Sequence, residues 1–207
     1  MELKAWFGLK SPEPPKPLQK EKTAQSQKPP VDYWKSRQRQ NYYQHVYALA
    51  LFVGRDARSV IDVGSNGCPY LEWFESIPRR LSVDLRNPYR SETVEGIASD
   101  FLKFQPPETF DLGLCLQVLE HVPDPAAFAA KLLSSSTELI VSVPYDWKPG
   151  TTGHIHHHLK EETIREWFGR SPDFQMISTE TNGVRRLICY FGPASRSGLK
   201  NTSPALN

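Results

Sequence analysis

This 207-residue sequence has few cysteines, no long apolar run and no strong excess of one charge. Its three cysteines, Cys68, Cys115 and Cys189, are widely spaced and odd in number, which argues against a disulfide framework and favours reduced thiols in a cytoplasmic protein. No apolar run is long enough to span a membrane, so no membrane partner is expected. The net charge of +2 gives no support for a nucleic-acid partner.

Two common nucleotide-binding motifs are also missing from the stretch 59–70. It contains neither G-x-G-x-x-G nor the Lys and Ser/Thr of a phosphate loop. A short β-branched run, 60–63, is followed by the turn 64–67 and by an apolar helix start at Tyr70. Strand, glycine-rich turn and helix form the opening unit of a nucleotide-binding α/β sheet, in which missing side chains let a ligand approach the backbone.

The string Asp62-Val63-Gly64-Ser65-Asn66-Gly67-Cys68 resembles the first motif of class I S-adenosylmethionine-dependent methyltransferases, acidic-x-Gly-x-Gly-x-Gly. The acidic residue and the first glycine match, whereas Asn66 and Cys68 occupy the second and third glycine positions. The resemblance implies the cofactor S-adenosyl-L-methionine. It also implies that the cofactor is bound by Asp62, Gly64, Ser65, Asn66 and Gly67.

Two further strand ends carry carboxylates. Asp84 ends a predicted strand at 81–84, where a carboxylate suits the two hydroxyls of a ribose; the alternative is a surface Asp that caps a loop. After a third predicted strand, 93–97, Asp100 and Phe101 match family positions that bind the adenine amine and pack on its ring. The alternative for Asp100 is a helix N-cap.

A fourth predicted strand, Phe110–Leu116, continues into Gln117-Val118-Leu119-Glu120-His121-Val122-Pro123-Asp124-Pro125. This string resembles the segment after the same strand in small-molecule methyltransferases of the ubiquinone-biosynthesis-like group. The resemblance implies that Gln117 and Leu119 line the methionine end of the cofactor. Glu120 and His121 are adjacent, so at most one is expected to face the reacting centre; alternatively both fix the loop by hydrogen bonds.

A histidine-rich loop, Gly153-His154-Ile155-His156-His157-His158, follows a fifth predicted strand at 139–143. It can supply a general base, hold a metal or only pack the loop. Because no carboxylate stands at ligand spacing, no metal is predicted. The predicted catalytic residues are His154, His157 and His121, whereas His156 and His158 are expected to serve the start of the next helix. Pro144, Tyr145 and Trp147 are expected near the acceptor.

These elements predict an α/β, Rossmann-like three-layer sandwich. Its mostly parallel seven-stranded sheet, a count implied by the resemblance, closes with an antiparallel C-terminal hairpin of Phe174–Thr179 and Arg185–Phe191. Residues 32–193 are predicted to form the methyltransferase domain, starting with a helix at about 32–53 that Asp32 caps. Residues 1–31 are predicted to be a disordered Pro/Lys/Gln-rich arm and residues 194–207 a flexible tail.

The predicted function is methyl transfer from S-adenosylmethionine to a small-molecule acceptor, such as a hydroxyl of a sugar or glycan-linked metabolite. No Asn/Asp-Pro-Pro-Tyr motif follows the fourth strand, which argues against DNA adenine, and the near-neutral charge argues against RNA. The alternative is a non-catalytic cofactor-binding or scaffold protein that recruits a protein partner through its N-terminal arm.

Overall fold

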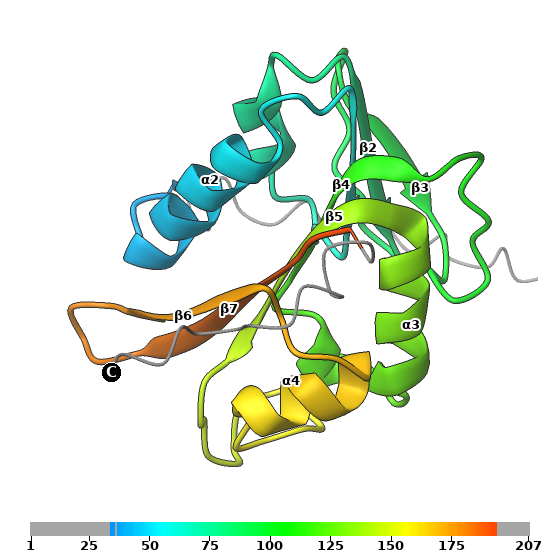
Figure 1. Cartoon of the computed structure of the whole chain (residues 1–207). Coiled ribbons are helices and arrows are strands. Elements are labelled where there is room, and N and C mark those ends of the chain that lie inside the picture. Colours follow the sequence, from blue (N-terminus) through cyan, green and yellow to red (C-terminus); the bar gives the residue numbers. More distant parts are fainter. Residues whose placement is uncertain (1–33, 36, 194–207) are drawn as a thin grey trace, which may run out of the picture.

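The computed structural model describes residues 34–35 and 37–193, and it is built around one seven-stranded sheet with the strand order β3-β2-β1-β4-β5-β7-β6 (Figure 1). The strands are β1 (Ser59–Val63), β2 (Arg79–Asp84), β3 (Glu95–Ala98), β4 (Phe110–Leu116), β5 (Ser136–Pro144), β6 (Phe174–Thr179) and β7 (Arg185–Phe191). The first five pair in parallel, and β7 runs antiparallel to both β5 and β6. The predicted fold class is confirmed, whereas the predicted arm and tail lie outside the described residues.

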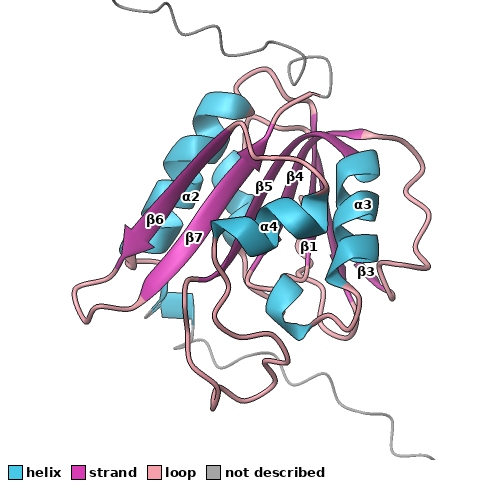
Figure 2. Ribbon diagram, turned by 60° about the horizontal axis from the view of Figure 1, so that its bottom comes forward, coloured by secondary structure: helices cyan, strands magenta, loops and turns pink. Residues whose placement is uncertain are grey.

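Helices cover both faces of this sheet and give three layers (Figures 1 and 2). One face carries α2 (Asn41–Val53) and the 3-10 helix η1 (Tyr70–Phe74), whose buried side chains share a core with Val60 of β1. The other face carries α3 (Pro125–Ser135) and α4 (Glu161–Phe168), which share a second core with Ile61. Neighbouring strand residues point to opposite faces, so one short strand serves both cores.

The first helix differs from its prediction. It begins at Asn41, not near residue 32, because Gln40 is extended (φ −67°, ψ 141°) and separates it from a short helical turn near residue 34. Its first two N–H groups, of Asn41 and Tyr42, donate to the carboxylate of Glu180 at 2.9 and 3.0 Å. The cap therefore comes from the β6–β7 connection, and the predicted cap Asp32 lies outside the described residues. The helix ends at Gly54 as predicted.

The connections on the β3 side of the sheet contain little helix. The predicted helix after the glycine turn is only the five-residue η1, and no helix links β2 to β3 or β3 to β4 in the described stretch 79–110. The connection after β4 contains a second 3-10 helix, η2 (Leu119–His121), before α3. No helix in the described part of the chain is both long and apolar enough to cross a bilayer.

Candidate active site

A cleft of about 590 Å³ lies at the carboxyl ends of β1, β2 and β4. The strand order reverses between β1 and β4, and at such a switch point the loops that leave the strands diverge and leave room for a ligand. Residues from several segments line it, among them Gly64, Asp84, Gln117, His121 and His154. Its volume is in the range of small-molecule sites.

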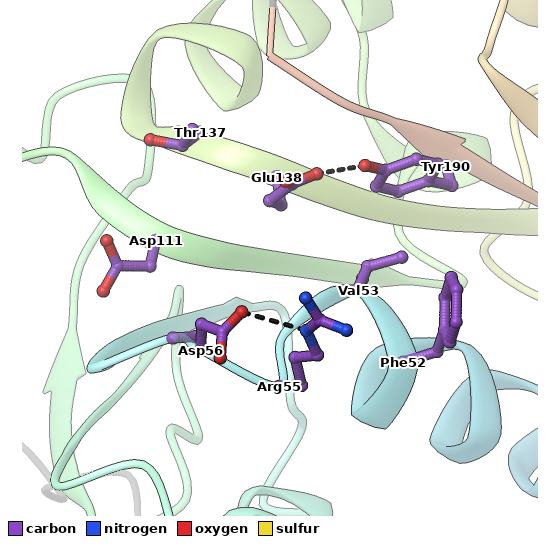
Figure 3. Close-up of a pocket in the computed structure, with 9 residues that line it drawn as sticks. Phe52, Val53, Arg55, Asp56, Asp111, Thr137, Glu138 and Tyr190 are labelled. Atoms are coloured by element: carbon purple, nitrogen blue, oxygen red, sulfur yellow. Dashed lines mark hydrogen bonds and ion pairs between the residues drawn. The ribbon is translucent and has the colours of Figure 1, made fainter.

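A second hollow, of about 440 Å³, lies at the opposite edge of the sheet (Figure 3). Asp111 and Glu138 line it close to where β4 and β5 begin, together with the exposed ion pair of Arg55 and Asp56. The glycine turn and the cleft lie at the carboxyl ends of the parallel strands. This hollow lies at their amino ends, so it takes no part in the candidate site.

The glycine turn requires its first glycine for two reasons. Gly64 has φ +90°, a conformation that residues with a side chain rarely adopt. A Cβ at this position would also lie 2.4 Å from Cγ2 of Val118. Asn66 takes φ +47° in place of a second glycine, as its side chain tolerates. The turn thus brings bare backbone to the cleft beside the segment that follows β4.

The carboxylate of Asp84 joins the glycine turn to the loop that follows β2 by hydrogen bonds. One carboxylate oxygen accepts the N–H of Asn66 at 2.9 Å, and the other accepts those of Arg86 (2.9 Å) and Asn87 (2.8 Å). A carboxylate has about four acceptor positions, so one remains for a ligand in the cleft that Asp84 lines. Asp84 therefore caps a loop, which was the alternative to ribose binding. The remaining acceptor position still allows it to accept a hydrogen bond from a ribose hydroxyl.

Ser65 and Asp62 support the turn from behind. The buried hydroxyl of Ser65 accepts the N–H groups of Gly67 (3.2 Å) and Tyr89 (3.0 Å). Asp62 is fully buried and lies behind Tyr70, whose hydroxyl donates to Asp62 Oδ1 at 2.6 Å. Its other oxygen, Oδ2, has no hydrogen-bond partner. Burial raises the pKa of Asp62 to about 8 despite the Tyr70 hydrogen bond.

Five predicted cofactor residues do not line the cleft: Asp62 and Gly67 of the glycine turn, and three residues elsewhere in the chain. Asp100 accepts the N–H of Leu102 at 3.0 Å and so caps a turn. Phe101 is buried against Phe128, with ring centroids 5.1 Å apart. Leu119 is fully buried in the core that α3 covers. The proposed contacts of these residues with the adenine and methionine groups remain predictions.

Gln117 lines the cleft as expected, in a conformation that the sequence did not indicate. Its φ is +60°, unusual for a residue other than glycine, and its N–H donates to the Ser142 carbonyl at 3.0 Å. This left-handed residue turns the chain from β4 into η2. Both Glu120 and His121 then line the cleft, and the expectation that at most one of them faces the reacting centre stays a prediction.

Glu120 and His121 meet His154 from the loop after β5. Nδ1 of His121 donates to the Gly153 carbonyl at 2.8 Å, and its Nε2 lies 3.9 Å from Oε1 of Glu120. The rings of His121 and His154 are 4.7 Å apart, edge to face. One nitrogen or oxygen atom from each of the three residues lies within 4.8 Å of the other two.

Burial shifts the protonation of this group. It raises the pKa of Glu120 to about 8, because the side chain is 1 % exposed. Its Oε2 has no hydrogen-bond partner among the described residues. Burial also lowers the pKa of His154, and the neighbouring His121 and His157 lower it further. His154 is therefore a neutral imidazole at pH 7, with a free lone pair for a proton or a metal.

The other loop histidines have different roles. His156 donates from Nε2 to the Val122 carbonyl at 2.9 Å, and His158, at φ +53°, pairs with Asp146 at 3.0 Å. His157 does not line the cleft, and its buried Nδ1 has no hydrogen-bond partner. Its predicted catalytic role stays a prediction.

The histidine end of the cleft also includes Trp147 and Arg186. Trp147 lines it as expected and stacks on His154, with centroids 5.8 Å apart and planes 11° from parallel. Arg186 was missed, since it stands in a strand with no motif around it. Its guanidinium is nearly buried, 3.5 Å from Glu180 and over the ring of Tyr42.

No family model and no curated protein matches this sequence. Among solved structures, the fold is that of class I S-adenosylmethionine-dependent methyltransferases. The N-methyltransferase NodS from Bradyrhizobium japonicum WM9, in complex with S-adenosylhomocysteine, matches with a TM-score of 0.62 at 15 % identity, over 79 % of this chain and 93 % of that one.

The 1,6-didemethyltoxoflavin-N1-methyltransferase from Burkholderia thailandensis also matches with a TM-score of 0.62, at 19 % identity over 77 % of this chain and 80 % of that one. Magnesium protoporphyrin IX methyltransferase from Synechocystis PCC 6803 matches with a TM-score of 0.52, at 18 % identity over 72 % and 82 %. At such identities the likeness establishes the fold.

Proposed function

We propose that this chain is an S-adenosylmethionine-dependent methyltransferase that acts on a small molecule. The observation that carries the proposal is that Gly64, Asp84 and Gln117 meet in one cleft at the strand switch point. In support, structures of this fold from two of the matched enzymes were solved with S-adenosylhomocysteine bound. The proposal gives each of the three residues a task that its geometry suits.

The cofactor supplies a methyl group already activated on a sulfonium ion, so the protein mainly aligns the reactants and excludes water. The bare backbone at Gly64 admits the methionine portion, and the remaining acceptor position of Asp84 takes a ribose hydroxyl. Gln117 orients the methionine end from the opposite wall. Asp62 supports the turn through Tyr70.

At the other end of the cleft, the group of Glu120, His121 and His154 receives the acceptor. We infer an oxygen acceptor, such as a sugar or glycan-linked hydroxyl, because a hydroxyl must lose its proton and titratable groups are placed here for that step. Trp147 offers a flat apolar surface for the rest of the acceptor. A purely scaffolding protein would have no use for this arrangement, and the proposed partner-binding arm lies outside the described residues.

Calorimetry with S-adenosylmethionine and S-adenosylhomocysteine tests the cofactor, and an acceptor screen that measures S-adenosylhomocysteine production tests the reaction. We expect one cofactor per chain and turnover with hydroxylated acceptors. A folded protein that binds neither compound would overturn the proposal. Binding without turnover across sugars, phenols and amines would favour the non-catalytic alternative.

A further inference from the structure

We propose that Glu120, His121 and His154 bind a divalent first-row metal ion, Zn²⁺ or a neighbour such as Co²⁺ or Mn²⁺, at the acceptor end of the cleft. No metal is predicted from the sequence, because no carboxylate stands at ligand spacing from the histidine loop. The fold supplies one from the loop after β4. The metal site itself does not depend on the proposed function, whereas the role given to the ion below does.

The distances fit a shared ion better than they fit hydrogen bonds. Nε2 of His121 and Oε1 of Glu120 are 3.9 Å apart, too far for a hydrogen bond. Two ligands that each lie about 2.0–2.2 Å from one cation are roughly 3–4 Å from each other. The three ligand atoms lie within 4.8 Å of one another, so a closing movement of about 1 Å completes the set.

The outer contacts prepare His121 as a ligand. The Gly153 carbonyl only accepts hydrogen bonds, so Nδ1 of His121 carries the proton and Nε2 keeps its lone pair. Ligating histidines usually have such a partner on the other ring nitrogen, which fixes the ring and its tautomer. Nε2 is also the atom that faces Glu120.

Glu120 gives an independent indication of a cation. Its side chain is 99 % buried, it lines the cleft, and Oε2 has no hydrogen-bond partner among the described residues. A buried carboxylate oxygen without a donor is costly, and a metal ion supplies the missing positive charge. Arg186, which lines the same cleft, is paired with Glu180 at 3.5 Å.

The backbone holds the two loops together around this group. The N–H groups of Ile155 and His156 both donate to the Glu120 carbonyl, at 2.9 and 3.2 Å. Trp147 stacks on the His154 ring, and its own indole N–H donates to the Arg185 carbonyl at 2.8 Å. The ligands are thus positioned by contacts that do not involve the metal.

Two imidazoles and one carboxylate suit a first-row ion better than Mg²⁺ or Ca²⁺, which prefer oxygen ligands throughout. Three protein ligands leave open positions that face the cleft, as in catalytic metal sites. If the proposed function holds, an acceptor oxygen binds there and becomes more acidic. The hydroxyl releases its proton to solvent, its oxygen bonds to the methyl carbon, and the carbon–sulfur bond breaks to leave S-adenosylhomocysteine.

The test is Co²⁺ and Zn²⁺ binding to the untagged, EDTA-dialysed chain, followed by calorimetry and by the visible spectrum of Co²⁺. We expect one ion per chain, with affinity reduced by about 100-fold or more in Glu120→Gln and His154→Ala. The matched control is His158→Asn, which removes a loop imidazole outside the site while keeping a residue that tolerates φ +53°.

Weak or non-stoichiometric metal binding by the wild type would overturn the proposal. Equal metal affinities in the wild type and the three variants would also overturn it. S-Adenosylhomocysteine binding, measured on the same samples, reports that each variant is folded. It also separates the two proposals: cofactor binding without metal binding refutes only the metal site, and metal binding without cofactor binding refutes only the proposed function.

Discussion

The two ends of the cleft are assembled over different distances in the chain. At the cofactor end, Asp84 meets Asn66 over 18 positions and Ser65 meets Tyr89 over 24. At the acceptor end, His121 meets Gly153 over 32 positions, and the contact joins two separate loops. The contacts of the proposed cofactor end thus join segments that carry recognisable motifs, whereas those of the proposed acceptor end join two loops that no motif connects.

The largest effect is expected from Gly64→Ala, at the centre of the cofactor end. Strain at φ +90° costs about 1–3 kcal/mol, and the new Cβ would displace Val118, so affinity for S-adenosylhomocysteine should fall by about 100-fold or more. Calorimetry measures this loss. Gly183→Ala is the control, since Gly183 has φ +81° with no atom near its Cβ position. Equal affinities in both variants would contradict the proposed role of Gly64.

His154→Ala probes the acceptor end. With saturating acceptor, turnover should fall by about 100-fold, the usual contribution of a positioned catalytic group, while cofactor affinity stays the same. His158→Asn should keep full turnover, because its imidazole pairs with Asp146 outside the cleft. Normal turnover by His154→Ala would leave acceptor activation to other groups.

Asp84→Asn should weaken cofactor binding by about 10- to 100-fold, the scale of a hydrogen bond to a charged group. The amide oxygen can keep the two contacts to Arg86 and Asn87, while the bond from Asn66 and the ligand position are lost. Asp111→Asn is the matched control. Asp111 likewise accepts two backbone N–H groups, at the opposite edge of the sheet. Unchanged affinity in Asp84→Asn would remove Asp84 from the site.

The smallest effect concerns the pH dependence of stability. The pKa of Asp62 is raised to about 8, so the native state keeps a proton that the unfolded chain loses near pH 4. The free energy of unfolding should therefore fall as pH rises from about 4 to 8, by about 1 kcal/mol per pH unit near neutrality. Glu120 contributes in the same direction.

Asp62→Asn should flatten this decline in part, because Glu120 still contributes to it. Urea unfolding of the ligand-free, EDTA-treated proteins at pH 5, 6, 7 and 8 measures both slopes. Parallel curves for the wild type and the variant would show that Asp62 does not retain its proton in the folded protein.

Local patterns in the sequence predicted much of this architecture. The ranges of β4, β6 and β7 are those predicted, since each is an apolar or alternating run ended by clear turn residues. The start of α2 was wrong because its cap, Glu180, is 138 positions from Tyr42. A cap supplied through tertiary contact has no local sequence signature.

The candidate site, like the fold, could be predicted only in part from local patterns. The motif residues Gly64, Asp84 and Gln117 do line one cleft, although their cofactor contacts remain predictions. The joint exposure of Glu120 and His121 to the cleft depends on the positive φ of Gln117. Glutamine gives no signal for such a conformation, so no pattern in the chain groups Glu120 with the histidine loop.

The cap of α2 also has a consequence for local unfolding. Glu180 joins the first turn of this helix to the β6–β7 hairpin, and Arg186 neutralises it from within β7. The amide hydrogens of Asn41 and Tyr42 are therefore protected by a residue near the other end of the chain. In hydrogen exchange they should open together with the hairpin, so that the helix start and the hairpin behave as one cooperative unit.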